Sequence, residues 1–182
     1  MNDKYSLSKI VGLGSRDNFS ISVNKQSGVT AYITGPFIIF YDIKKDKQIK
    51  FIINKNNKIF KCLSFSESGN LLAAAEGNNK NCEIAIYEVN GENVKLKCSF
   101  KAHKLGIEKV KFFKNDKYLI SIGDKEDKTI NIWSLSNNEN IFTSKYNRPI
   151  IAFDICDNFL IFGGQQFIKI WTFGEPMDTN KF

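Results

Sequence analysis

The stretch "LISIGDKEDKTINIWSL" (Leu119–Leu135) decides the fold. An apolar run ends in Gly123, charged residues fill Asp124–Lys128, and apolar and polar residues then alternate up to Trp133. Short runs rich in β-branched and aromatic residues, separated by a polar segment, are typical of β-strands joined by a turn. The stretch therefore predicts two antiparallel strands joined by a tight, charged turn.

The second of these strands has counterparts elsewhere in the chain. Four segments share an apolar–x–apolar–aromatic core: "PFIIFYDI" (Pro36–Ile43), "EIAIYEV" (Glu83–Val89), "TINIWSL" (Thr129–Leu135) and "FIKIWTF" (Phe167–Phe173). Their aromatic residues, Tyr41, Tyr87, Trp133 and Trp171, are separated by 46, 46 and 38 residues. This spacing indicates an internal repeat of about 40–46 residues.

The residues upstream of each aromatic repeat as well. "CLSFSESGNLLAAAEG" (Cys62–Gly77), "KVKFFKNDKYLISIG" (Lys109–Gly123) and "IAFDICDNFLIFGG" (Ile151–Gly164) each read as strand, polar turn and strand, and "SISVNKQSGVTAYITG" (Ser20–Gly35) is a weaker copy. Fourth strands follow three of the aromatics, as "QIKFII", "VKLKCSF" and "NIFTSK". A β-sandwich also has frequent turns, but it would not repeat one four-strand phrase. We predict an all-β fold of about four propeller blades, each a four-stranded antiparallel sheet.

The third unit, "AHKLGIEKVKFFKNDKYLISIGDKEDKTINIWSL" (Ala102–Leu135), resembles a WD repeat. Ala102-His103 stands where the family has Gly-His, and Ser134 stands where it has the Asp that follows Trp. The resemblance implies a hydrogen-bonded structural tetrad of His103, Ser121, Asp127 and Trp133. A buried indole N–H needs an acceptor, and a histidine between a carboxylate and a hydroxyl satisfies both ring nitrogens.

Ser121, His103 and Asp127 are also the residue types of a hydrolase triad. No G-x-S-x-G segment surrounds Ser121, which lies in "LISIG". "VGLGSRD" (Val11–Asp17) lacks the G-K-[ST] of a phosphate-binding loop. We therefore expect no catalytic, cofactor-binding or metal-binding residues, and no enzyme activity.

Composition favours an intracellular, soluble protein. There is no apolar run of about 18 residues, and the start "MNDKYSLSKI" lacks the apolar centre of a signal peptide. The four cysteines form no C-x-x-C pair and there is one histidine, so a zinc site is not expected. We expect no membrane partner.

The formal net charge of +7 raises the question of whether the protein binds nucleic acid. Of the 26 basic residues, only Arg16 and Arg148 are arginine, and the lysines are spread along the chain. Arginine is the residue suited to bidentate phosphate and guanine contacts. Nucleic-acid binding is therefore not expected, and the charge favours acidic proteins or peptides as partners.

Within WD-repeat proteins, "LSKIVGLGSRDNFSISVNKQSGVTAYITGPFIIFYDIKKDKQIKFI" is similar to the start of the mitogen-activated protein kinase-binding WD-repeat scaffolds. "HKLGIEKVKFF" and "FIKIW" resemble their later blades, so the similarity covers most of residues 7–173. The resemblance implies a non-catalytic cytoplasmic scaffold in kinase signalling or at spindle poles. No segment matches a kinase-docking motif.

The expected division is one partial β-propeller over residues 1–182, with blades near 18–54, 58–100, 106–145 and 149–173. Residues 7–14 are a candidate ring-closing strand, and residues 174–182 read as a polar tail. WD propellers usually have seven or eight blades, so we expect this chain to be a fragment of such a ring. Exposed blade edges would then allow self-association.

In a propeller, the loops entering first strands and the turns joining second to third strands share one rim. On this rim we expect Lys104, Glu126, Arg148 and Gln165 to contact a partner protein or peptide. The favoured function is a protein interaction scaffold. The alternative is a WD-repeat protein that binds the cytoskeleton, in particular microtubules, whose surface is acidic.

Overall fold

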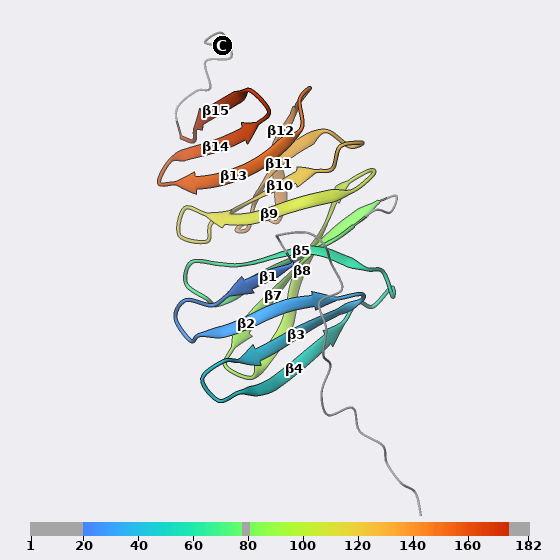
Figure 1. The fold of residues 1–182 in the computed structure, drawn as a ribbon, viewed down its shortest axis with the longest axis vertical. Coiled ribbons are helices and arrows are strands. Elements are labelled where there is room, and N and C mark those ends of the chain that lie inside the picture. The colour runs from blue at the N-terminus through green and yellow to red at the C-terminus, as the bar shows by residue number, and fades with distance from the viewer. Residues whose placement is uncertain (1–19, 78–80, 175–182) are drawn as a thin grey trace, which may run out of the picture.

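The computed structural model describes residues 20–77 and 81–174, and in these residues all regular structure is β. The described residues form fifteen strands in four antiparallel sheets. In Figure 1 the last sheet along the chain lies at the top and the third lies below it, while the first two overlap in the lower half. The candidate ring-closing strand at 7–14 and all but the first residue of the polar tail at 174–182 lie outside the described residues.

Each sheet is a meander, in which consecutive strands are neighbours. Blade one contains β1 (Ile21–Val23), β2 (Val29–Thr34), β3 (Phe37–Asp42) and β4 (Lys47–Ile53). Blade two contains β5 (Phe60–Phe65), β6 (Leu71–Glu76), β7 (Cys82–Asn90) and β8 (Asn93–His103). Blade three contains β9 (Ile107–Phe113), β10 (Tyr118–Gly123), β11 (Thr129–Ser134) and β12 (Glu139–Lys145). Blade four contains β13 (Ile150–Cys156), β14 (Phe159–Gly164) and β15 (Phe167–Thr172).

The strand register explains why the aromatic residues repeat. Tyr87, Trp133 and Trp171 on the third strands pair with Leu72, Leu119 and Leu160 on the second strands, and Tyr41 pairs with Thr30. Because side chains alternate across a strand, each pair lies on the same face of its blade. The repeated spacing in the sequence is thus a repeated position in the sheet.

The hydrophobic core lies between the blades, in three separate clusters. Ala31, Ile33, Ile38 and Phe40 of blade one pack on blade two, and Ala73, Ala75, Ile84 and Ile86 of blade two pack on blade three. Ile120, Ile122, Ile130 and Ile132 of blade three pack on Leu160 and Phe162 of blade four. Every one of these residues is 2% exposed or less. Apolar residues therefore occupy both faces of the second and third strands, because a neighbouring blade covers each face.

Polar contacts also join neighbouring blades. Ser22 Oγ of blade one accepts the N–H of Phe65 at 3.0 Å, and Asn24 Nδ2 donates to the carbonyl of Gly69 at 2.8 Å. Between blades three and four, the buried Lys109 ammonium donates to the carbonyls of Ile150 and Ile151 at 2.9 and 2.6 Å. Burial lowers the pKa of Lys109, while the nearby Glu108 carboxylate raises it. These contacts fix how one blade sits on the next.

The packing between blades three and four generates a stability prediction. Ile132 is fully buried in that cluster, so Ile132→Ala leaves a cavity and should lower the free energy of unfolding by about 2–5 kcal/mol. Urea unfolding followed by tryptophan fluorescence measures the change. Ile43 is 59% exposed, and Ile43→Ala should change the free energy by less than about 0.5 kcal/mol. Equal effects of the two substitutions would contradict the packing described here.

Candidate functional site: a loop-bearing rim and the network beneath it

A buried hydrogen-bonded chain runs through blade three. Trp133 Nε1 donates to Ser121 Oγ at 2.9 Å, and Ser121 Oγ lies 2.8 Å from His103 Nε2. On the other side of the imidazole, His103 Nδ1 lies 2.8 Å from Asp127 Oδ1. The structure thus brings together the four side chains from β8, β10, β11 and the turn before β11.

The carboxylate determines the proton positions. Asp127 accepts from Nδ1–H, so Nε2 of the neutral ring is the acceptor for the Ser121 hydroxyl. Ser121 in turn accepts from Trp133, so every donor in the chain has an acceptor. The Trp133 ring stacks on Phe100 of blade two, with ring centroids 5.0 Å apart. The network therefore fixes one geometry within blade three and against blade two.

Two further polar residues of β11 belong to the network and were missed from the sequence. Asn131 Nδ2 donates to the carbonyl of Ala102 at 3.1 Å, and Thr143 Oγ1 donates to Asn131 Oδ1 at 2.7 Å. Thr129 Oγ1 donates to Asp127 Oδ1. Thr129, Asn131 and Trp133 alternate with buried isoleucines in "TINIW", and that alternation was the available signal.

Asp127 also controls the loop that precedes β9. Its Oδ2 accepts the backbone N–H groups of Lys104 at 2.9 Å and Leu105 at 3.3 Å. Asp124 Oδ1 accepts the N–H groups of Glu126 and Asp127, closing the charged turn from within. The side chains of Lys125, Glu126 and Lys128 are exposed. The turn between β10 and β11 is therefore fixed by its aspartates and presents its other charges to solvent.

The network explains why the apolar run of β10 ends in glycine, at Gly123. A methyl group at this position would lie 2.9 Å from His103 Nδ1 and closer still to Asp127 Oδ1. Any larger residue would push the imidazole away from its carboxylate. The glycine is thus required by the network rather than by an unusual backbone angle.

The network also determines two pKa values. Burial, the larger effect, lowers the pKa of His103, although the hydrogen bond and charge of Asp127 raise it. For Asp127, burial raises the pKa, but hydrogen bonds from Thr129, His103 and the Leu105 backbone outweigh it, so the net pKa is lowered. The neutral imidazole and the ionised carboxylate are the forms that the fold favours.

This arrangement does not fit a nucleophilic serine. Ser121 is 0% exposed and its oxygen is enclosed between the indole and the imidazole. A substrate carbonyl must come within bonding distance of a nucleophile, and a fully buried side chain is not accessible to it. The contacts of Ser121, His103 and Asp127 are those of a structural network.

The rim above this network carries the four residues predicted to contact a partner. Lys104 lies between β8 and β9, Glu126 between β10 and β11, Arg148 between β12 and β13, and Gln165 between β14 and β15. All four are exposed. Because consecutive strands are antiparallel, these connections open on the same side of the sheets. That they contact a partner remains a prediction.

Hydrogen bonds tie the connections of this rim to one another. The Asp124 N–H donates to the Gly106 carbonyl at 3.1 Å, and the Asn81 N–H donates to the Lys104 carbonyl at 3.1 Å. Tyr146 Oη donates to the carbonyls of Gly123 and Asp124 at 2.7 and 2.9 Å. The rim is thus a connected surface spanning blades two, three and four.

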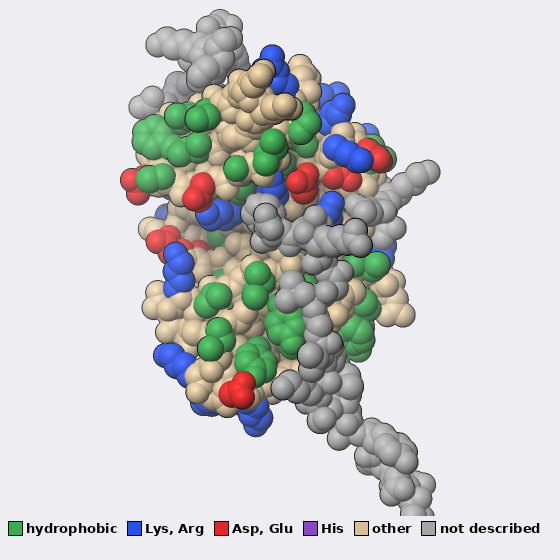
Figure 2. Space-filling view, in the orientation of Figure 1, with side chains coloured by type: hydrophobic (Ala, Val, Ile, Leu, Met, Phe, Trp, Pro, Cys, Tyr) green, Lys and Arg blue, Asp and Glu red, His purple; other side chains and the backbone are tan. Residues whose placement is uncertain are grey.

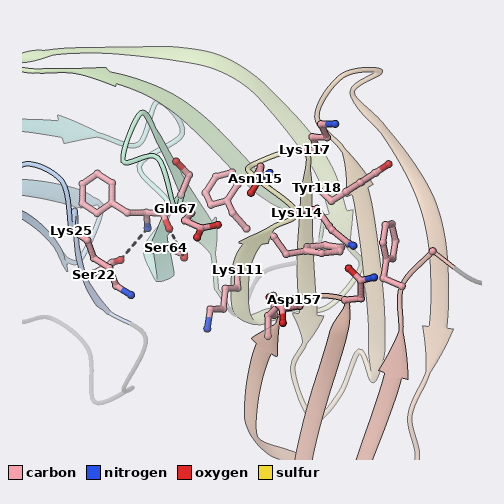
Figure 3. Close-up of a pocket in the computed structure, with 18 of the residues that line it drawn as sticks. Ser22, Lys25, Ser64, Glu67, Lys111, Lys114, Asn115, Lys117, Tyr118 and Asp157 are labelled. Atoms are coloured by element: carbon pink, nitrogen blue, oxygen red, sulfur yellow. Dashed lines mark hydrogen bonds between the residues drawn. The ribbon is translucent and has the colours of Figure 1, made fainter.

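The opposite rim holds a cavity that sequence reasoning did not find. It has a volume of about 870 Å³ and lies among the first strands of the blades and the turns that follow them. Figure 3 shows Ser22 and Ser64 on one side, Tyr118 and Asp157 on the other, and Lys111 between them. Lys111 forms an ion pair with Asp154. Both basic and acidic side chains line the cavity, so its charge does not indicate one class of ligand.

The described residues contain no group of three or more His, Cys, Asp or Glu side chains arranged to hold a metal ion. No disulfide joins any two of the four cysteines, Cys62, Cys82, Cys98 and Cys156, all of which lie in the described residues. No helix capable of crossing a membrane was found in the described part of the chain.

Comparison with known proteins agrees with this geometry. The family model described as WD domain, G-beta repeat, matches residues 94–134, which end at the tetrad tryptophan and its neighbour. A chain from the crystal structure of the mitotic checkpoint complex superposes with a TM-score of 0.68 at 16% sequence identity. The match covers 85% of this chain and 47% of that one. Together these findings confirm the predicted all-β, WD40-repeat β-propeller fold, present here as part of a larger propeller.

Several curated proteins are distant relatives. Cilia- and flagella-associated protein 52 of Sus scrofa is 24% identical over 180 residues, covering 95% of this chain and 29% of the relative. The Chlamydomonas reinhardtii protein of the same name is 21% identical over 179 residues. WD repeat-containing protein 90 of Mus musculus is 24% identical over 175 residues, covering 93% of this chain and 9% of the relative. The chain thus spans less than a third of the length of these relatives.

These relatives support only the broader part of the resemblance seen in the sequence. They support the WD40-repeat superfamily, but they do not specifically support the mitogen-activated protein kinase-binding scaffolds. Strand phrases that suggested those scaffolds, such as "HKLGIEKVKFF", place buried residues, here Ile107, Val110 and Phe112, between blades two and three. They therefore report the fold and not a subfamily.

The network predicts a coupled effect of two substitutions. Ser121→Ala leaves both the Trp133 N–H and His103 Nε2 without their partner and should lower the free energy of unfolding by about 1–3 kcal/mol. Trp133→Phe should cost a similar amount, but the double variant should cost less than the sum of the two. Chemical denaturation followed by circular dichroism measures all three. Additive costs would show that the two side chains act independently.

The lowered pKa of His103 predicts acid sensitivity. The unfolded imidazole binds a proton more readily than the folded one, so the free energy of unfolding should fall as pH drops below about 6.5. The slope from one proton cannot exceed about 1.4 kcal/mol per pH unit. Because His103 is the one histidine of the chain, His103→Gln should flatten the profile between about pH 6.5 and 5. If His103→Gln left the dependence of the unfolding free energy on pH unchanged, this prediction would be wrong. The lowered pKa of Asp127 also makes the protein less stable in acid, but at lower pH than His103 does.

Proposed function

We propose that this chain is a non-catalytic protein-binding module that docks on a microtubule-based structure through the rim above the tetrad. The observation that carries the proposal is a set of exposed basic side chains on that rim: Lys104, Lys125, Lys128 and Arg148. Among the described residues, none of the four forms an ion pair. Their charge is therefore free to attract an acidic partner.

The acidic residues of the same rim do not cancel this charge completely. Asp124 and Asp127 are held below the surface by backbone N–H groups and by His103. Glu126 alone among the acidic side chains of the turn is exposed. The rim is also fixed in shape by the network beneath it, so a partner meets a preorganised surface and binding costs less ordering entropy.

The comparisons support the microtubule part of the proposal. WD40 domains generally mediate protein–protein interactions, and two of the relatives carry cilia and flagella in their names. Cilia and flagella are built around microtubules, whose surface is acidic, and this chain has a formal net charge of +7. We therefore propose cytoskeletal association as the location of the protein. Kinase signalling and spindle-pole organisation rest on the sequence resemblance alone.

Co-sedimentation with purified microtubules tests the proposal. The full chain should pellet with microtubules at low salt and dissociate as salt rises, because charge dominates the contact. Lys104→Glu combined with Arg148→Glu should weaken the apparent affinity at least tenfold, since both residues lie on the rim. Failure of the unmodified chain to pellet at low salt would remove the microtubule proposal.

A matched control separates the rim from net charge. Lys114 and Lys117 lie between β9 and β10, on the opposite rim, and changing both to Glu lowers the net charge by the same amount. This variant should keep most of the affinity. An equal loss in both variants would show non-specific attraction and would exclude the rim as the binding surface.

A further inference from the structure

A pocket between blades one and two lies where blade three holds its hydrogen-bonded network. It has a volume of about 380 Å³, which is within the size range of pockets that bind small groups. All of its lining residues fall within 52–99, on β4 to β8 and the turns that join these strands. Both walls of the pocket therefore belong to two consecutive blades of the described chain.

The strand register explains why the pocket is there. Tyr87 of blade two stands at the register position of Trp133 in blade three. The neighbouring positions, which are polar in blade three, carry smaller side chains in blade two: Ala74 for Ser121, Ala85 for Asn131 and Ser99 for Thr143. His103 is the one histidine of the chain, so blade two has no imidazole. The space that the network fills in blade three is therefore left open in blade two.

Apolar side chains form much of the pocket wall. Phe60, Tyr87 and Val94 are buried, Ile52 is half-buried, and Leu96 is exposed. Apolar surface thus runs from the interior of the pocket to the solvent. An aliphatic chain that enters the pocket gains apolar contact along its length, while a polar group at its tip needs a hydrogen-bonding partner inside.

The Tyr87 hydroxyl is one such partner. Tyr87 is 7% exposed, and its Oη forms no hydrogen bond with any described residue. Among the described residues, Thr30 Oγ1 alone is both enclosed and without a partner, so Tyr87 Oη reaches open space, and this residue lines the pocket. Burial, and then the charge of Glu76, raises the pKa of Tyr87 to about 12, so the hydroxyl is neutral. A neutral hydroxyl can accept a hydrogen bond from an N–H group.

Two carboxylates also line the pocket. Glu76 is buried, and its oxygens accept from Asn54 Nδ2 and Lys58 Nζ, both at 2.9 Å. Glu83 lies on the same face of β7 as Tyr87, because side chains alternate along a strand. The Glu83 carboxylate forms no ion pair or hydrogen bond with any described residue. Glu83 therefore remains available to a ligand.

The charge of the lining differs from that of the whole chain. Glu76 and Glu83 face one basic residue of the lining, Lys55, whose side chain is exposed. The chain as a whole has a formal net charge of +7, and Figure 2 shows basic side chains spread over the visible face of the molecule. The excess of carboxylate is thus local to this pocket, and it favours a cationic ligand.

We propose that the pocket binds an arginine side chain of a partner protein. The aliphatic stem lies along Phe60 and Val94, and the guanidinium donates to the Glu83 carboxylate and to Tyr87 Oη. Arginine suits the site because its planar head presents five N–H donors and can reach two acceptors at once. The proposal goes beyond the proposed function, since this pocket selects a basic group whereas the rim attracts an acidic surface.

Titration of the full chain with acetyl-arginine amide, followed by NMR of the backbone amides, tests the proposal. Saturable shifts are expected at Glu83, Ala85 and Tyr87, with a dissociation constant on the order of a millimolar, because so small a ligand gains little binding free energy. Acetyl-citrulline amide has nearly the same shape without the charge and should bind at least about tenfold more weakly. Equal affinity for the two compounds, or no saturable shift with either, would overturn the proposal.

A charge variant and its matched control test the role of Glu83. Glu83→Gln should weaken the binding of acetyl-arginine amide at least about tenfold, because the guanidinium loses its ionised acceptor. Glu88 lies on the other face of the same strand and does not line the pocket, so Glu88→Gln should leave the affinity unchanged. An equal loss in both variants would show that net charge, and not this pocket, attracts the ligand.

A filling variant tests the location of the site without changing its charge. Ala85→Asn gives blade two the residue that blade three has at the same register position, so it should fold and occupy the pocket. Binding of acetyl-arginine amide should then be lost, although Glu83 is still present. Circular dichroism checks that the variant is folded. A folded Ala85→Asn chain that binds as well as the unmodified chain would overturn the proposal, and Glu83→Gln decides the matter if Ala85→Asn does not fold.

Discussion

The structure depends on one constraint: apolar residues lie on both faces of its sheets, so each blade is stabilised by packing against the blades next to it. A sheet with one solvent-exposed face needs apolar residues only at every second position of its strands. Here the second and third strands bury residues on both faces of the sheet. The core is divided into three layers between blades rather than gathered at one centre. The repeated phrase in the sequence and the positions of the turns both follow from that arrangement.

The hydrogen-bonded network adds to this packing in one place. Blade three has the indole, imidazole, hydroxyl and carboxylate, whereas Tyr41 and Tyr87 occupy the indole position in blades one and two. The same carboxylate that completes the network also holds the loop at Lys104. Structural order in the blade and the shape of the rim are therefore linked through Asp127, and the proposed binding surface lies above this network.

Much of the fold could be predicted from the sequence because packing on two faces leaves a pattern that alternation and spacing reveal. The tetrad residues could be named because each has a fixed place in a repeat unit. Lys109 could not be recognised: in "EKVKFF" it reads as a solvated lysine, and its partners are two backbone carbonyls of another blade. The cavity on the opposite rim was also missed, because it is formed by turns far apart in the chain. The subfamily could not be predicted from the sequence, since apolar strand phrases are common to many propellers.

The buried ammonium of Lys109 has a consequence for chemical reactivity. An amine that is 1% exposed and hydrogen-bonded to the start of β13 is shielded from acylating reagents, whereas the many lysines on the turns are open to them. It becomes reactive when blade four moves away from blade three. The rate at which an acylating reagent labels Lys109 therefore measures how often these two blades separate in the native protein.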